Sequence, residues 1–289
     1  MTIDAASANA ALAGAVERYW GYSTFRPLQR EAMEAILADR DSLVVLPTGG
    51  GKSLCFQAPA LVREGLAIVV SPLISLMKDQ VDTLVGNGVS AAFLNSSLSS
   101  DARSTITSGV RDGKYRLLYV SPERLVGEGG DGFQSWLSRC NVSFIAVDEA
   151  HCVSQWGHDF RPDYLNIGEA RERLGAPPCV ALTATATPRV QDDIAEVLGL
   201  RDAARIVTGF NRPNLLFSVR STPTAKEKKN ALAAFLHERE GQPGLVYVST
   251  RKEADAIARF IREHAGREAR TYHAGLPDAE RTEVQERFL

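Results

Sequence analysis

Short runs of apolar residues alternate with longer stretches of helical composition through most of the chain. Seven of these runs are Ser42–Leu46, Ala67–Val70, Ala91–Leu94, Leu117–Val120, Phe144–Val147, Cys179–Leu182 and Arg205–Val207. The stretches of helical composition include Leu28–Ala38, Ser75–Val85, Ser99–Val110 and Arg189–Leu198. Strands that are apolar throughout, and that alternate with helices, are typical of a parallel sheet covered on both faces. The pattern therefore predicts an α/β fold with a parallel sheet flanked by helices.

The same alternation restarts after a polar stretch that contains a proline, Gly209–Asn214, which we interpret as a hinge. Beyond it the pattern predicts strands at Leu215–Val219, Leu245–Val248 and Arg270–Tyr272, and helices at Lys226–Glu240, at Arg251–His264 and from Pro277 onward. We therefore expect a first lobe over residues 1–208 and the start of a second, incomplete lobe over residues 209–289.

Composition narrows the class of protein. The chain has 289 residues, of which 44% are hydrophobic and 24% charged, and its net charge is −2. This mixture is typical of a globular protein. A near-neutral charge argues against attachment to DNA by bulk charge, so any nucleic-acid contact must come from a local group of Lys and Arg side chains.

The cysteines and the apolar runs exclude other classes. None of the four cysteines (Cys55, Cys140, Cys152 and Cys179) belongs to a C-x-x-C pair, so we expect no zinc site and no dithiol redox site. No apolar run approaches the ~18–20 residues that a membrane helix needs. Asp4 and the lack of a basic N-terminal region argue against a signal peptide, and we expect a cytoplasmic protein with no membrane partner.

A glycine-rich segment follows the first apolar run and precedes the helical stretch Leu54–Val62. Its candidate nucleotide-binding residues are Thr48, Gly49, Gly50, Gly51, Lys52 and Ser53. Glycines let backbone N–H groups turn toward phosphate oxygens at a helix N-terminus. Lys52 would reach the β- and γ-phosphates of ATP, and the Ser53 hydroxyl would bind Mg²⁺. The strict phosphate-loop pattern has Gly where Leu46 stands, and the alternative is a glycine-rich strand-to-helix turn.

Two adjacent carboxylates end the apolar run Phe144–Val147, in the order Asp148-Glu149-Ala150-His151. In a phosphate-loop ATPase, such carboxylates hold Mg²⁺ and activate water. We expect Asp148 to bind Mg²⁺, Glu149 to act as the base, and His151 to connect this segment to its neighbours. A solvated loop is the alternative for Asp-Glu at a strand end.

A third segment, Ala181–Thr187, runs from a strand into hydroxyl residues. Thr187 followed by Pro188 is typical of a helix start, and hydroxyls close to the two carboxylates suit detection of the γ-phosphate. These three segments, in this order, resemble the phosphate loop, DEAH box and TAT motif of superfamily 2 helicases.

Two further segments resemble the RecQ family in particular. Residues 20–29 are similar to its adenine-recognition motif, in which Tyr22 and Arg26 would sandwich the base and Gln29 would hydrogen-bond its edge. Residues 154–162 are similar to its aromatic-rich loop, which couples single-stranded DNA to ATP hydrolysis. The residues expected to act there are Gln155, Trp156, His158, Phe160 and Arg161.

Weaker matches place hydroxyl, amide and basic groups at strand ends, where they suit phosphate contacts that are indifferent to base sequence. They are Ser71, Lys78, Asn95 and Ser121. The resemblance implies two RecA-like lobes, the second incomplete, with ATP and Mg²⁺ as cofactors and single-stranded and duplex DNA as partners. It also implies a monomer that unwinds DNA with 3′→5′ polarity in recombination and repair.

Three other functions stay open on the sequence. They are an RNA helicase of the same superfamily, a non-motor phosphate-loop enzyme such as a small-molecule kinase, and a non-enzymatic nucleotide or DNA binder. The family's later motifs, including its arginine finger, have no counterpart before Leu289. We therefore expect this chain to bind nucleotide without being a complete motor.

Overall fold

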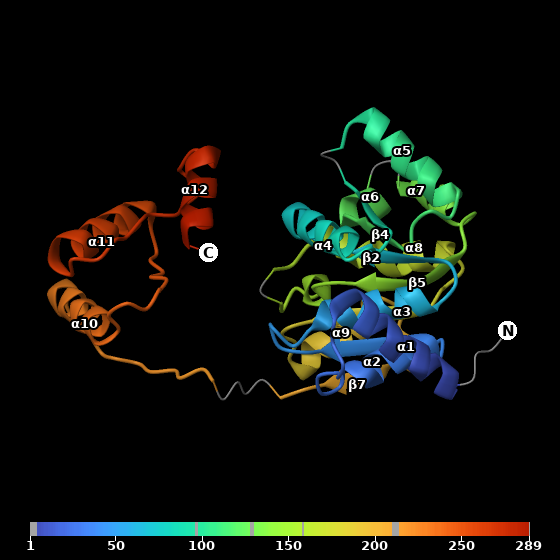
Figure 1. Ribbon diagram of the computed structural model, residues 1–289, viewed down its shortest axis with the longest axis horizontal. Helices are drawn as coiled ribbons and strands as arrows, with labels where there is room; N and C mark the ends of the chain where they lie inside the picture. Colours follow the sequence, from blue (N-terminus) through green and yellow to red (C-terminus); the bar gives the residue numbers. More distant parts are fainter. Residues whose placement is uncertain (1–4, 96–97, 128–129, 158, 210–213, 289) are drawn as a thin grey trace. The chain divides into compact units, whose positions relative to one another are not determined.

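The computed structural model describes residues 5–95, 98–127, 130–157, 159–209 and 214–288. The chain divides into two compact units, Met1–Arg212 and Pro213–Leu289, and each is described by itself. The first unit is a RecA-like α/β domain built on a parallel sheet (Figure 1), which confirms the predicted fold class.

Seven strands form this sheet in the order β3-β4-β2-β5-β6-β1-β7, and every pair of neighbours is parallel. Their bounds are β1 Ser42–Val45, β2 Leu66–Val70, β3 Ala91–Leu94, β4 Leu117–Val120, β5 Val142–Val147, β6 Cys179–Thr183 and β7 Ala204–Val207. The bounds lie within two residues of the apolar runs in the sequence. Every residue of β1, β2, β4 and β6 is buried, as expected for strands covered on both faces.

Helices cover both faces of the sheet. Their bounds are α1 Ala5–Trp20, α2 Gln29–Leu37, α3 Lys52–Val62, α4 Ile74–Gly86, α5 Ser100–Arg111, α6 Pro122–Val126, α7 Gly130–Leu137, α8 Ile167–Arg173 and α9 Pro188–Val197, with 3-10 helices η1 Ala150–Val153 and η2 Pro162–Asn166. In the part of the chain that the structure describes, no helix is both long and apolar enough to cross a membrane.

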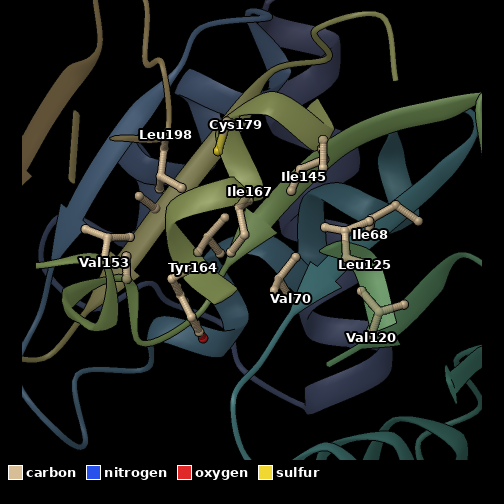
Figure 2. Close-up of a cluster of buried hydrophobic side chains, with 14 of the residues drawn as sticks. Ile68, Val70, Val120, Leu125, Ile145, Val153, Tyr164, Ile167, Cys179 and Leu198 are labelled. Atoms are coloured by element: carbon tan, nitrogen blue, oxygen red, sulfur yellow. The ribbon is translucent and has the colours of Figure 1, made fainter. Parts of the chain in front are cut away.

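Successive residues of each strand point to opposite faces, so the sheet separates two hydrophobic clusters. Ile68 and Val70 of β2 pack with α5 to α9 and with the 3-10 helices, and Figure 2 shows these two side chains close to those of Ile145, Tyr164 and Ile167. The neighbouring residues Ala67 and Val69 pack with α2, α3 and α4 on the other face.

A buried ion pair joins the start of β1 to the elements around it. Both carboxylate oxygens of Asp41 accept hydrogen bonds from the Arg171 guanidinium, at 2.7 and 2.9 Å. Asp41 also accepts from the backbone N–H of Cys179 at 2.8 Å and of Arg201 at 2.6 Å. Arg171 donates as well to the carbonyls of Pro177 and Gly199, each at 2.8 Å. Such a set of bonds offsets the cost of burying both charges.

The second unit contains α10 (Ala225–Glu238), α11 (Arg251–His264) and α12 (Asp278–Phe288). These helices were predicted to within two residues. They form locally, because hydrogen bonds within each helix suffice and a side chain caps the start: Thr224 accepts from the Glu227 N–H, and Thr250 accepts from the Glu253 N–H.

The three strands predicted for the second unit were wrong for the residues that the structure describes. Leu215–Val219, Leu245–Val248 and Arg270–Tyr272 have irregular backbone. A strand exists only through hydrogen bonds to a neighbouring strand, and the described part of this unit provides none. Side chains meant for a core stay exposed as a result, with Leu216 91% and Tyr247 90% exposed.

The predicted hinge Gly209–Asn214 includes residues 210–213, which lie outside the described residues. The boundary at residues 208 and 209, and the identity of the second unit as a RecA-like lobe, stay predictions.

Replacing Arg171 by Ala leaves the Asp41 carboxylate buried without its partner. We expect the variant to lose about 3–5 kcal/mol of the free energy of unfolding, measured by urea denaturation. The matched control is Arg173→Ala, which removes exposed ion pairs with Asp131 and Glu169 and should cost less than about 1 kcal/mol. Equal losses in the two variants would contradict a special role for the buried pair.

Candidate functional site

Three polar segments meet at the carboxyl edge of the sheet because β5, β6 and β1 are neighbours in it. The glycine-rich loop follows β1, Asp148 and Glu149 follow β5, and Thr183 ends β6. In open α/β sheets, this edge is where ligands bind. The fold therefore brings together the segments that the sequence singled out.

The glycine-rich loop is tightly folded before α3, which begins at Lys52. Gly49 and Gly51 have φ of 80° and 77°, in the left-handed region that favours glycine. A Cβ on Gly51 would lie 2.2 Å from the Gln29 amide nitrogen, so the loop accepts no side chain there. Lys52 Nζ donates to the Leu46 carbonyl at 3.3 Å, which places the ammonium inside the loop.

The segment predicted to recognise adenine lies against this loop. Gln29 is buried, accepts from the Arg26 N–H at 2.8 Å and donates to the Gly51 carbonyl at 3.0 Å. The Arg26 guanidinium donates to the Gly49 carbonyl. Tyr22 is 55% exposed and open to a ligand. Gln29 and Arg26 therefore brace the loop, a contact that the sequence did not reveal.

Asp148 is buried at the end of β5, and its Oδ1 accepts from the Glu149 N–H at 3.0 Å. Burial and the adjacent Glu149 carboxylate raise the pKa of Asp148 from 3.8 to about 6, while Lys52 and a hydrogen bond from Gln80 oppose the rise. Tyr164 donates its hydroxyl to the Asp148 carbonyl at 3.0 Å. Two close carboxylates at a dry edge favour a bound cation.

Glu149 has a φ of 48°, which a residue with a side chain adopts at a cost and which is common at functional sites. His151 Nδ1 lies 3.3 Å from a carboxylate oxygen of Glu149 and 2.9 Å from the Thr183 hydroxyl. The Thr183 hydroxyl donates to the Thr185 carbonyl at 3.2 Å, so it accepts from His151. His151 thus connects the segment after β5 to the end of β6.

The aromatic-rich loop is tied to α9. The Arg189 guanidinium lies 3.8 Å from the centroid of the Trp156 ring, which is 66% exposed, and the Ser154 hydroxyl donates to the Asp193 carboxylate. Neither partner on α9 was predicted, because nothing in the sequence marks a contact between segments so far apart. In this loop Gln155 is exposed.

The rest of the loop turns back toward the sheet. Arg161 donates to the Pro72 carbonyl at 2.9 Å and pairs with Asp159 at 3.0 Å. Phe160 is partly buried, and His158 lies outside the described residues.

The candidate phosphate contacts divide into two groups. Ser71, Asn95 and Ser121 are buried at the ends of β2, β3 and β4. Lys78 is exposed on α4, where it pairs with Asp82. Of these four, Lys78 is the side chain within reach of a ligand from solvent.

The family comparison decides what this edge belongs to. Residues 26–194 match the DEAD/DEAH box helicase model. The chain belongs to that helicase family. The matched residues include the glycine-rich loop, the two carboxylates and the aromatic-rich loop.

Within the family, the chain is similar to RecQ helicases, as the sequence predicted. It is 45% identical to the ATP-dependent DNA helicase RecQ of Bacillus subtilis over 94% of its own length, and 42% identical to that of Pasteurella multocida over 93%. These matches cover 45% and 42% of the two relatives, so the chain spans less than half of their length.

Solved structures share the fold at low identity. The helicase MrfA bound to DNA has a TM-score of 0.72 at 17% identity, over 96% of this chain and 42% of that one. The DEAD-box helicase Mss116 bound to single-stranded RNA has a TM-score of 0.66 at 16% identity, over 96% of this chain and 61% of that one.

We expect Asp148→Asn to raise the free energy of unfolding of the ligand-free chain at pH 8 by about 1–3 kcal/mol, because it removes a buried charge. A raised pKa means that the folded state binds the proton more tightly than the unfolded state. The wild type therefore gains stability as the pH falls from about 6 toward 3.8, and the advantage of the variant shrinks there.

Urea denaturation at pH 8 and pH 5 measures both values. Glu149→Gln, which alters the less buried neighbour, is the control and should show a smaller gain. Destabilisation by Asp148→Asn at pH 8 would mean that the carboxylate is fully compensated in the folded chain.

Proposed function

We propose that this chain is the nucleotide-binding part of an ATP-dependent DNA helicase. The observation that supports this most directly is the convergence of the glycine-rich loop, Asp148, Glu149 and Thr183 on the neighbouring strands β1, β5 and β6. Relatives that are 42–45% identical are named ATP-dependent DNA helicases, which supports the same function.

The residues present fit a nucleotide with a divalent cation. The N–H groups of Thr48 to Ser53 would surround the phosphates at the start of α3, with Lys52 as the counter-charge. Carboxylate and hydroxyl oxygens are ligands that Mg²⁺ prefers, and Asp148 and Ser53 would supply them. A cation in this place would neutralise charge that develops on the phosphates.

Glu149 is the candidate general base. Its carboxylate is partly exposed, so a water molecule can reach it, whereas Asp148 is buried. The contact with His151 orients this carboxylate and links it to Thr183. Glu149 would accept the proton of the attacking water while Lys52 holds the phosphate charge.

Base choice would rest on Tyr22, Arg26 and Gln29. Tyr22 offers an exposed ring for stacking, and Arg26 offers a planar guanidinium. Because Arg26 and Gln29 also bind carbonyls of the glycine-rich loop, adenine bound here would be linked directly to the loop that holds its phosphates.

DNA is favoured over RNA by the names of the relatives and by the exposed Trp156, whose ring can stack on a base. An RNA helicase is the second candidate, because Mss116 bound to RNA shares the fold. Polarity of 3′→5′ and a role in recombination and repair follow from the resemblance alone. The monomeric state and the cytoplasmic location stay predictions.

Binding of a fluorescent ATP analogue to the 289-residue chain tests the proposed function. We expect Mg²⁺-dependent binding that Lys52→Ala weakens roughly 10-fold or more, since loss of a hydrogen bond to a charged group costs about 1.5–3 kcal/mol. Glu149→Gln should retain binding and abolish any slow hydrolysis. Binding that is independent of Mg²⁺ and of Lys52 would contradict the proposal.

Trp156→Ala should weaken binding of an oligo-dT strand about 5-fold or more, because stacking contributes about 1–3 kcal/mol per base. Fluorescence anisotropy measures the affinity, and an oligo-U strand compares RNA. The control is Trp136→Phe, whose ring is stacked on Phe133 and should leave DNA affinity unchanged. Unchanged affinity in Trp156→Ala would mean that this ring only packs against α9, and stronger binding of oligo-U would favour the RNA helicase.

A further inference from the structure

Side chains from four elements of the first unit form a hydrogen-bonded network beside the candidate cation site. Tyr119 of β4 is fully buried, and its hydroxyl accepts from the Gln57 amide of α3 at 2.9 Å. The same hydroxyl donates to Gln80 Oε1 of α4 at 2.9 Å. Gln80 also hydrogen-bonds the Asp148 carboxylate after β5. The network therefore ends on the carboxylate that is proposed to bind Mg²⁺.

The amide of Gln80 can be oriented in one way only. Its Oε1 receives the Tyr119 hydroxyl and lies 3.3 Å from the Gln57 amide nitrogen, so the oxygen faces two donors. The amide nitrogen is then left for the Asp148 carboxylate, which can only accept when it is ionised. Gln57 and Tyr119 thus hold Gln80 with its donor directed at Asp148.

A small cavity of about 260 Å³ adjoins this network between α3 and α4. The residues that line it are Ser53, Gln57, Asp79, Gln80, Thr83 and Leu84. Ser53 is the second proposed cation ligand, and it shares the cavity with Gln80. Gln80 is therefore in contact with one proposed ligand, Asp148, and lines the same polar cavity as the other, Ser53.

We propose that Gln80 is a positioning residue that holds the Asp148 carboxylate in place for a divalent cation. This inference rests on the proposed function and deepens it. Carboxylates that bind metals are commonly fixed by outer hydrogen bonds, and removing such a partner weakens metal binding roughly 10–100-fold. Because Gln80 lies on α4, two residues after the exposed Lys78, it also joins the cation site to the surface that Lys78 presents.

Metal affinity, rather than turnover, separates this role from a structural one. Mn²⁺ binding to the 289-residue chain is measured by electron paramagnetic resonance in the presence of a non-hydrolysable ATP analogue. Gln80→Met keeps the length of the side chain and removes its amide, and we expect Mn²⁺ affinity to fall roughly 10-fold or more. Metal-free binding of the analogue should change less than about 2-fold, because Gln80 is directed at the carboxylate that binds the cation.

Two further variants control the experiment. Thr83→Val alters another residue of the same cavity, whose hydroxyl donates to the Asp79 carbonyl, and should leave Mn²⁺ affinity unchanged. Tyr119→Phe keeps Gln80 but removes the hydroxyl that holds it, and Mn²⁺ affinity should fall by a smaller factor of about 3.

The outcomes separate this inference from the proposed function. Unchanged Mn²⁺ affinity in a folded Gln80→Met variant, or an equal fall in Thr83→Val, overturns the positioning role. Should Gln80→Met fail to fold, Tyr119→Phe decides in the same way. Failure of the wild-type chain to bind Mn²⁺ with the analogue would instead overturn the proposed function.

Discussion

The arrangement of the site depends on how β1 is held between β6 and β7, two strands that come much later in the chain. Asp41 stands directly before β1 and accepts hydrogen bonds from the backbone at Cys179, where β6 begins, and at Arg201, before β7. Arg171 neutralises its charge in a site that water does not reach. With its amino end fixed in this way, β1 delivers the glycine-rich loop to the carboxyl edge beside Thr183.

The two edges of the sheet treat buried charge differently. At the amino edge, Asp41 has a complete set of donors. At the carboxyl edge, Asp148 is as deeply buried but receives less help from its own chain, and burial together with Glu149 raises its pKa. A folded domain keeps such a carboxylate at a cost in stability, and such costs are concentrated where a ligand supplies the missing charge.

The sequence alone was sufficient for the strands of the first unit and for the residues of the candidate site, since both follow local patterns. The contacts of Gln80 with Asp148 and of Arg189 with Trp156 could not be predicted, because they join elements that only the fold brings together. The second unit shows the opposite limit. Apolar runs such as Leu245–Val248 have the composition of strands, but composition does not supply the neighbouring strand that a ladder requires.

The choice between nucleic acids must lie outside the sheet. MrfA bound to DNA and Mss116 bound to RNA share the fold with this chain at 16–17% identity, so the fold itself does not discriminate between the two. The aromatic-rich loop is better placed to do so. Trp156 is exposed, yet Ser154 and Arg161 fix the backbone on either side of it through Asp193 and Pro72. A ring held on a fixed backbone costs little entropy when a base stacks on it, and it lies in the segment that follows Asp148 and Glu149. Contact with a strand is therefore made next to the carboxylates rather than at a distance from them.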